Sequence, residues 1–244
     1  MRRRHLSDKP AVIAMNQPTV SATIASQQQD AEESWLQSWQ RGPTRLRWTS
    51  VPLQAGELAP DLELHDASGA TVHLRHTWRD GPALLLFWRH YGCSCGRDRA
   101  RRLQAEHERY ASLGVNVVVI GQGGPERSRV YAQKNELPCP VLCDPARHAY
   151  DAYGLLEGQP SQIVFDAPDE FLRRDYEAGR KLQQSRHGTD AVPVDSPWQL
   201  PGEFVIDRAG MVCLAYRYQY CEDWPDPLVL VAAIKEAGGK LSEA

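Results

Sequence analysis

The segment from residue 83 to residue 103, ALLLFWRHYGCSCGRDRARRL, constrains the fold of this chain more than any other. An uncharged apolar run ends at Arg89 and His90. Cys93 and Cys95 follow, and a basic stretch with helical spacing then begins. This order predicts a buried strand joined to a helix, with both thiols at the junction. Because the first N–H groups of a helix carry partial positive charge, a thiolate is stabilised there, and we interpret the chain as a thiol protein.

The composition excludes several classes of protein. The chain has 244 residues, enough for one domain with appendages, and its 42% hydrophobic and 24% charged content predicts a globular fold. The net charge of −3 lacks the basic excess that is typical of nucleic-acid binding. No apolar run reaches the roughly 18 residues that a membrane-spanning helix needs. We therefore expect no nucleic-acid partner and no membrane association.

The N-terminus resembles the charged start of an export signal, MRRRHL, but the apolar stretch after it covers only residues 11–15. We therefore expect a cytoplasmic protein. Residues 1–30 are polar and are predicted to form a disordered extension. Residues 31–55 are predicted to form a short helix, over 31–40, and a linker. We expect this helix to dock on the domain through one apolar face, with partner binding as the alternative; the face comprises Trp35, Leu36 and Trp39.

The domain proper is predicted over residues 56–240, with an insertion at about 155–200. Strands are expected at 61–64, 71–74, 83–88, 115–120, 141–142, 203–207 and 211–216. Helices are expected at 96–113, 125–135, 145–153 and 228–236, with a further helix at 168–184 inside the insertion. Such alternation predicts a mostly parallel sheet covered on both faces, to which the last hairpin adds antiparallel strands. The insertion is either a lid over the site or surface decoration.

Five motifs carry a resemblance to a known family: GELAPDLEL at 56–64, FWRHYGC at 87–93, LPCPVLCDPARHAYDAYGL at 137–155, WQLPGEFVIDRAG at 198–210 and DWPDP at 223–227. The chain resembles the alkyl hydroperoxide reductase/thiol-specific antioxidant group, which are peroxiredoxin-like proteins of the thioredoxin-like superfamily. The resemblance implies an α/β three-layer sandwich with a mixed central sheet. It also implies reduction of peroxides at the expense of an external thiol such as thioredoxin or glutathione. We expect no nicotinamide, flavin or metal cofactor, and we count a homodimer among the assemblies open to the chain.

The sequence departs from that family at several positions. Leu86 and His90 stand where peroxiredoxins place a proline and a hydroxyl residue before the reactive cysteine. Gly96 stands where the second cysteine of C-x-x-C would be, so the motif here is C-x-C. Peroxiredoxins place an arginine shortly before the late strand. Here that stretch reads Leu200-Pro201-Gly202, which is similar to the cis-proline stretch of thioredoxin-type reductases. These departures bear on peroxidase activity more than on thiol redox chemistry.

We expect Cys93 to be the reactive thiol, Arg89 to stabilise the anion and Cys95 to be the resolving partner. The expected substrate contacts are Trp88, His90, Tyr91 and Pro201. The alternatives are a thioredoxin-type disulfide oxidoreductase, which would use the same pair of cysteines on protein disulfides, and a non-enzymatic thiol or metal redox sensor.

The sequence pattern predicts lesser roles for the other four cysteines. Cys143 and Cys213 are predicted to lie in the core, and Cys139 to be exposed between two prolines. Cys221 falls in a predicted loop from which it could resolve in trans, but we do not select it. Zinc or copper(I) binding by the pairs 93/95 and 139/143 ranks below redox chemistry, because the spacing differs from the common C-x₂-C pairs.

Overall fold

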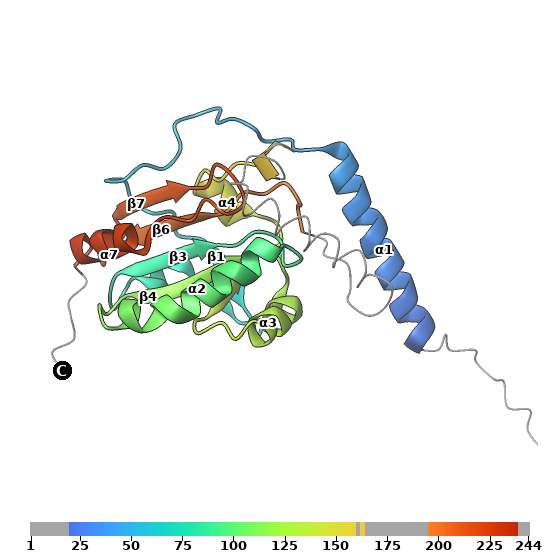
Figure 1. Ribbon diagram of the computed structural model, residues 1–244, viewed down its shortest axis with the longest axis horizontal. Helices are drawn as coiled ribbons and strands as arrows, with labels where there is room; N and C mark the ends of the chain where they lie inside the picture. Colours follow the sequence, from blue (N-terminus) through green and yellow to red (C-terminus); the bar gives the residue numbers. More distant parts are fainter. Residues whose placement is uncertain (1–19, 160–161, 164–194, 239–244) are drawn as a thin grey trace, which may run out of the picture.

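A single seven-stranded sheet organises the computed structural model, which describes residues 20–159, 162–163 and 195–238 (Figure 1). The strand order is β2-β1-β5-β4-β3-β6-β7. The strands are β1 (Glu63–Asp66), β2 (Thr71–His73), β3 (Ala83–Phe87), β4 (Asn116–Gly121), β5 (Val141–Cys143), β6 (Gly202–Ile206) and β7 (Val212–Arg217). Every strand expected from the sequence is present, and β3 lies inside the sheet between β4 and β6.

The sheet is mixed, with only β3, β4 and β5 running parallel to one another. The hairpins β1–β2 and β6–β7 join it through antiparallel pairs of β1 with β5 and of β3 with β6. The expectation of a mostly parallel sheet is therefore wrong. The physical reason is that a helical crossover is needed to return a strand in the same direction, and only β3, β4 and β5 are joined in this way.

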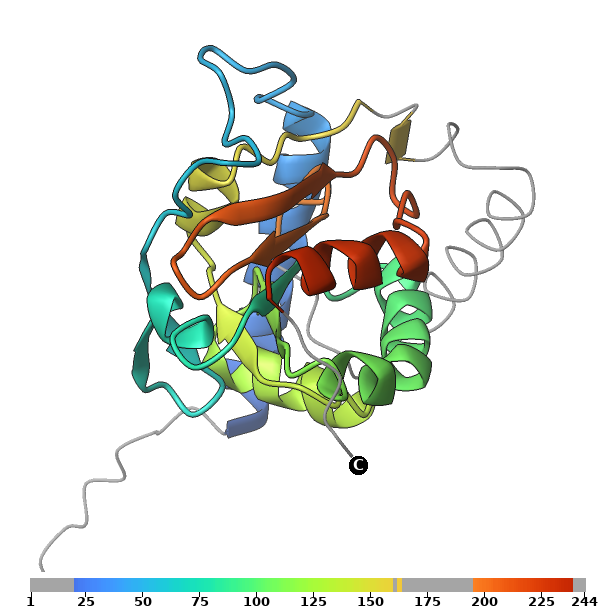
Figure 2. The ribbon, with the colours of Figure 1, turned by 90° about the vertical axis from the view of Figure 1, so that its left-hand side faces the viewer.

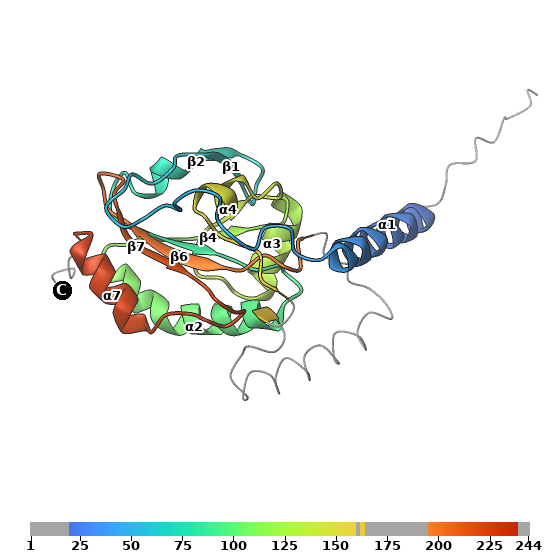
Figure 3. The ribbon, with the colours of Figure 1, turned by 90° about the horizontal axis from the view of Figure 1, so that it is seen from above.

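Helices cover both faces of the sheet. The helices of the domain are α2 (Ser94–Ala111), α3 (Pro125–Lys134), α4 (His148–Ala152) and α7 (Pro227–Glu236). Side chains alternate along β3, so that Leu84 and Leu86 pack with α2 and α7. Leu85 and Phe87 face the opposite side, where they pack with residues of α4. Figure 3 shows α2 and α7 together on one side of the sheet. The three-layer arrangement expected from the sequence is confirmed.

The first helix, α1, covers Val20–Arg41 and so begins well before the expected residue 31. Residues 20–30 of the extension expected to be disordered belong to this helix, whereas residues 1–19 lie outside the described residues. The sequence of residues 20–29 holds no charge, no glycine and no proline, but it lacks an apolar stripe, and so periodicity gave no signal. α1 and α7 lie at opposite ends of the molecule (Figures 1 and 2).

Two tryptophans of α1 contact the domain. Trp35 meets the ring of His90 edge-on, with ring centroids 4.9 Å apart, and Trp39 stacks on Trp198 at 4.5 Å. The indole N–H of Trp198 also donates to the backbone carbonyl of Ser38 at 2.9 Å. These contacts bring α1 against the end of the sheet where β3 passes into α2.

The expected insertion leaves and rejoins the domain at one place. Glu157 and Gln199 form an antiparallel bridge, and Gly158 donates from its backbone N–H to the carbonyl of Trp198 at 2.8 Å. The helix expected at 168–184 lies outside the described residues. The bridge fixes the described segment 195–200 beside the carboxyl end of β3, and this segment forms one wall of the site.

Candidate active site

The turn from β3 into α2 places Cys93 at the N-cap of α2, in an extended conformation with φ −77° and ψ 136°. α2 begins at Ser94, two residues before the expected start, so that Cys95 lies in its first turn. The two thiols are nearly buried, with 9% and 3% of their surfaces exposed. They belong to a small apolar cluster that also contains Cys221, which comes from the segment between β7 and α7. Three thiols therefore meet at the predicted junction.

Arg89 is buried among these thiols. Its Nη1 donates to the sulfur of Cys93 at 3.1 Å and to the sulfur of Cys221 at 2.7 Å. Its Nη2 donates to the carbonyl of Pro197 at 2.5 Å, and its Nε to the carbonyl of Gln199 at 3.3 Å. None of these four acceptors is a carboxylate. Burial disfavours the charged guanidinium, but the sulfurs of Cys221 and Cys93 raise the pKa of Arg89, so it stays protonated.

The three thiols differ sharply in acidity. Hydrogen bonds from Cys221 and Cys95, together with the charge of Arg89, hold the pKa of Cys93 well below its ordinary value despite burial. Burial, reinforced by hydrogen bonds to Cys221 and Cys93, raises the pKa of Cys95. The hydrogen bond to Cys93 raises the pKa of Cys221 as well. These shifts favour ionisation of Cys93 over that of the other two thiols.

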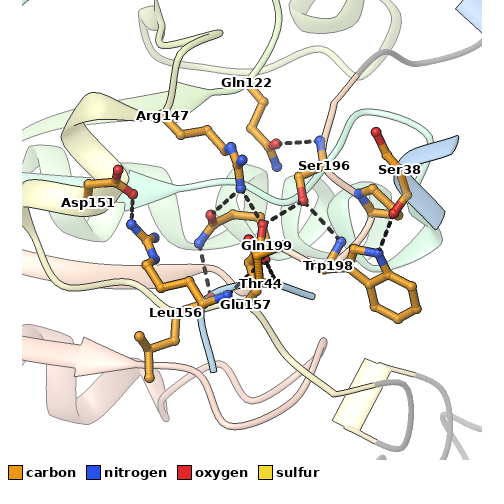
Figure 4. Close-up of polar contacts among 12 residues, drawn as sticks. Ser38, Thr44, Gln122, Arg147, Asp151, Leu156, Glu157, Ser196, Trp198 and Gln199 are labelled. Carbon is orange, nitrogen blue, oxygen red and sulfur yellow. Dashed lines mark hydrogen bonds and ion pairs between the residues drawn. The ribbon is translucent and has the colours of Figure 1, made fainter. Parts of the chain in front are cut away.

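A polar network fixes the carbonyls that hold Arg89 (Figure 4). Ser196 donates from its backbone to Gln122 Oε1 at 2.9 Å and from its hydroxyl to Glu157 Oε1 at 3.1 Å. Gln199 donates through Nε2 to the carbonyl of Leu156 at 3.1 Å. Glu157 also accepts from Arg147 at 2.6 Å. Because these contacts come from several elements, the carbonyls that receive Arg89 are held in place.

Trp88 and Pro201 both line a cavity that reaches the thiols and encloses about 300 Å³ with its open mouth. Arg89, Cys95 and Cys221 also lie on its wall, whereas Cys93 does not. The indole N–H of Trp88 donates to the hydroxyl of Tyr131 at 2.8 Å. The described residues contain no cis peptide bond, so the suggested cis-proline at Pro201 is wrong. The carbonyl of Pro201 accepts from Tyr218, and the chain enters β6 directly afterwards.

His90 and Tyr91 lie beside the thiols in different ways. Burial, and then the charge of Arg89, lower the pKa of His90 to about 4, so its ring is neutral at neutral pH. Tyr91 stacks on Tyr131 with centroids 4.2 Å apart, and its hydroxyl pairs with that of Ser128 at 2.8 Å. Neither residue is among those that line the cavity.

Gly96 explains why the motif is C-x-C. A Cβ added at this position would lie 2.7 Å from the hydroxyl oxygen of Tyr131 and 2.9 Å from Nε1 of Trp88. Those two atoms are hydrogen-bonded to each other. A cysteine at position 96 would therefore require the Trp88–Tyr131 pair to move.

Comparison with known proteins agrees with this geometry. The family model described as "AhpC/TSA family" matches residues 55–214. The chain belongs to the AhpC/TSA family. A curated relative, "Thioredoxin-like protein AAED1, chloroplastic" of Arabidopsis thaliana, is 28% identical over 97 residues, which is 40% of this chain and 39% of the relative. The chain thus matches about two fifths of the length of that relative.

Solved structures show that this AhpC/TSA protein has a thioredoxin-like fold. The peroxidoxin BcpB of Mycobacterium tuberculosis superimposes with a TM-score of 0.51 at 15% identity, covering 76% of this chain and 97% of that one. A putative thiol:disulfide interchange protein DsbE of Chlorobium tepidum gives a TM-score of 0.50 at 20% identity, covering 77% and 99%. The family model and the fold of the solved structures therefore agree with each other.

The remaining cysteines of this AhpC/TSA protein lie away from the thiol cluster. Cys143 is buried and donates to the hydroxyl of Ser128 at 3.2 Å, whereas Cys139 and Cys213 are half-buried, so only Cys143 is fully in the core as predicted. The part of the chain that the structure describes shows no group of three or more metal-binding side chains arranged around an ion. The pairs 93/95 and 139/143 do not meet, because β5 is separated from β3 by β4. Nor is any described helix long and apolar enough to cross a membrane.

Cys221 is the residue that the sequence prediction missed as a member of the site. It is 132 residues from Arg89, and no local spacing links the two. A strand pattern followed by a short polar loop gives no sign that the loop folds back onto the first strand-to-helix junction. The only signal in the sequence was that residue 221 is a cysteine.

Proposed function

We propose that this protein reduces peroxides, with Cys93 as the attacking thiolate. The observation that carries the proposal is the contact of 3.1 Å between Nη1 of Arg89 and the sulfur of Cys93 at the start of α2. A thiolate in this place is stabilised by a buried cation and by the unpaired N–H groups of the first helical turn. The same donors would stabilise the negative charge that develops on a peroxide oxygen.

In the first step, the thiolate of Cys93 attacks one peroxide oxygen in line with the O–O bond. An S–O bond forms, the O–O bond breaks, and the leaving alkoxide or hydroxide takes up a proton from solvent. The sulfur is oxidised to a sulfenic acid and the peroxide is reduced to an alcohol or water. Arg89 remains protonated throughout, so it acts as a fixed positive charge and not as an acid.

The second step requires a neighbouring thiol. A neutral thiol of the cluster loses its proton and attacks the sulfenic sulfur, so that a disulfide forms and water leaves. Two thiol groups of an external donor, such as thioredoxin or glutathione, then reduce the disulfide and are themselves oxidised. Cys95 is the partner expected from the sequence, and Cys221 is a second neutral thiol of the same cluster. A reducing compartment such as the cytoplasm would supply the donor.

The burial of Cys93 favours small peroxides. Only 9% of its surface is exposed, and it lies beside the cavity wall formed by Arg89. Hydrogen peroxide or a short alkyl hydroperoxide could reach the sulfur through a small movement of neighbouring side chains. We therefore expect the rate of peroxide reduction to fall as the organic group becomes larger.

A thioredoxin-type disulfide oxidoreductase is the second candidate, and one observation favours it. The cavity opens onto Cys95 and Cys221 and not onto Cys93. An incoming disulfide would therefore meet these two thiols first. Both are held neutral in the described state, however, and a neutral thiol is a poor nucleophile. Peroxide reduction by the Cys93 thiolate is therefore the stronger proposal.

The test is peroxide consumption with a thiol donor, measured for the wild type and for Cys93→Ser. We expect Cys93→Ser to lose all turnover above the uncatalysed rate. Cys139→Ser, which alters a half-buried thiol outside the cluster, is the matched control and should keep wild-type turnover. Undiminished peroxide turnover in Cys93→Ser would refute the proposal. Reduction of insulin disulfides by a wild-type protein that leaves peroxide intact would favour the second candidate instead.

A further inference from the structure

We propose that Cys221, and not Cys95, is the thiol that forms the disulfide with oxidised Cys93. This inference rests on the proposed function and deepens it by naming the resolving residue. The segment between β7 and α7 thereby becomes part of the redox centre.

The geometry around Arg89 places Cys221 beside Cys93. One nitrogen, Nη1 of Arg89, donates to the sulfurs of both residues, at 3.1 Å and 2.7 Å. Two sulfurs that share a single donor atom are close neighbours. Cys221 is also buried, with 2% of its surface exposed, so protein and not solvent surrounds it beside Cys93.

The backbone around Cys95 differs from the backbone around Cys221. Cys95 is the second residue of α2, and only one residue separates it from Cys93. A disulfide between the two would close a very small ring and would have to distort the first turn of the helix. Cys221 lies in a turn outside any helix or strand. A turn can adjust its dihedral angles without breaking a helical ladder, so this residue can approach Cys93 with less distortion.

The hydrogen bonds of Cys221 suit it to ionise after Cys93 has reacted. Its thiol donates to the carbonyl of Ile163 at 3.0 Å, and its sulfur accepts from Nη1 of Arg89 at 2.7 Å. Once Cys93 becomes a neutral sulfenic acid, the positive charge of Arg89 no longer faces an anion there. Cys221 is then the thiol that gains from ionisation, because its sulfur accepts from Arg89. Arg89 thus transfers its stabilisation from the first thiolate to the second.

Cys221 gives up its thiol proton, its sulfur attacks the sulfur of the Cys93 sulfenic acid, and the S–OH bond breaks. The hydroxide takes up a proton and leaves as water, so that a Cys93–Cys221 disulfide remains. Cys95 keeps its proton and serves as a hydrogen-bond donor. Two equivalents of external thiol restore both cysteines and leave as a disulfide.

The experiment maps the disulfide in the full-length wild-type protein. Reduced protein is mixed with one equivalent of hydrogen peroxide, quenched by alkylation after seconds, digested and analysed by mass spectrometry. We expect a peptide pair that joins Cys93 to Cys221. A Cys93–Cys95 disulfide, or a Cys93 sulfenic acid that persists in the wild type, would overturn the inference. This measurement needs no variant and therefore does not depend on the folding of a mutant.

Variants give the kinetic counterpart. In Cys221→Ser we expect the Cys93 sulfenic acid, trapped with a cyclic 1,3-dione, to survive about tenfold longer or more than in the wild type. Cys95→Ser should form the Cys93–Cys221 disulfide, and Cys213→Ser is a control outside the cluster. An equally short-lived sulfenic acid in Cys221→Ser and the wild type would contradict the assignment.

A second oxidant separates this inference from the proposed function. Oxidised glutathione reacts with a thiolate by disulfide exchange, first at Cys93, and the partner thiol then displaces the bound glutathione. A Cys93–Cys221 disulfide formed with glutathione but not with peroxide would refute the peroxidase proposal and support the pairing. A Cys93–Cys95 disulfide formed with either oxidant, or a glutathione adduct at Cys93 that persists, would refute the Cys93–Cys221 pairing but not the peroxidase proposal. Inertness of Cys93 towards both oxidants would refute both.

Discussion

Two arginines are buried on the wall of the same cavity, and they are neutralised in different ways. Arg99, on α2, donates to Glu203 at 2.8 Å and to Glu106 at 3.1 Å. Glu203 also accepts from the hydroxyl of Tyr218 at 2.5 Å. Arg89 donates only to sulfurs and backbone carbonyls among its recorded contacts. The charge of Arg99 is therefore balanced permanently, whereas that of Arg89 is balanced only when a thiol ionises.

The difference teaches what converts a buried cysteine into a nucleophile. Burial raises the pKa of Cys139 to about 12, and it raises the pKa of Cys143 and Cys213 as well. Cys93 is just as enclosed, yet its pKa is lowered, because two thiols and an arginine without a carboxylate partner donate to it. A carboxylate within reach of Arg89 would weaken this effect, since the cation would then be satisfied without a thiolate.

The largest effect is expected from Glu203→Gln, which leaves Arg99 with Glu106 as its remaining ion-pair partner. Breaking a buried ion pair from one side costs about 3 kcal/mol of unfolding free energy. Urea unfolding under reducing conditions measures the loss. Glu108→Gln, at an exposed position of α2, is the matched control and should change stability by less than about 0.5 kcal/mol. A loss below about 1 kcal/mol for Glu203→Gln would show that Arg99 does not depend on this carboxylate.

The next effect is expected from Arg89→Met, which removes the cation from the thiols. The thiolate of Cys93 is present above its lowered pKa and is lost as the pH falls through that value. In the variant, the same loss should occur at higher pH. At pH 7, alkylation of Cys93 by iodoacetamide should slow by up to about thirtyfold, because a thiol of ordinary pKa near 8.5 is only about 3% ionised there.

Raising the pH distinguishes this effect from a folding defect. As the pH is raised, the reaction of Cys93 in Arg89→Met should approach the wild-type rate, whereas a misfolded site would not show such recovery. Glu203→Gln should leave the midpoint of the Cys93 alkylation profile where it is in the wild type. If the midpoint of the Cys93 alkylation profile were unshifted in Arg89→Met, the two arginines would not differ in their effect on Cys93.

The smallest effect is expected from Cys213→Ser. This thiol is half-buried on β7 and has no cation beside it among its recorded contacts, and burial raises its pKa. The peroxide reaction of Cys93 should be unchanged, and the stability should change by less than about 1 kcal/mol. Stopped-flow measurement with hydrogen peroxide checks the first point and urea unfolding the second. A slower peroxide reaction would mean that reactivity does not reside in the cluster around Arg89 alone.

Local patterns predicted those parts of the structure that depend on neighbouring residues. The apolar run of β3, the helix after it and the placement of Cys93 and Arg89 at their junction all follow from a stretch of about twenty residues. The turn between β1 and β2 is equally local, because Asp66 accepts from Ser68 and Ala70. Such features were therefore visible before the fold was known.

Features that depend on distant pairing were not visible in the sequence. The contact of Arg89 with Cys221 spans 132 residues, and the pair of Arg99 with Glu203 spans 104. The antiparallel pairing of β1 with β5 likewise depends on where the first hairpin is placed against the sheet. The alternation of apolar and polar residues determines which residues face inwards but does not name their partners.

The steric conflict at Gly96 has an evolutionary consequence. A change from C-x-C to C-x-x-C cannot proceed through the glycine alone, because the new side chain would collide with Tyr131 and Trp88. Loss of Tyr131 first would leave the indole of Trp88 without its acceptor in a buried place. Residue 96 and the aromatic pair are thus coupled, and we expect a cysteine at position 96 to require a compensating change at Tyr131 or Trp88.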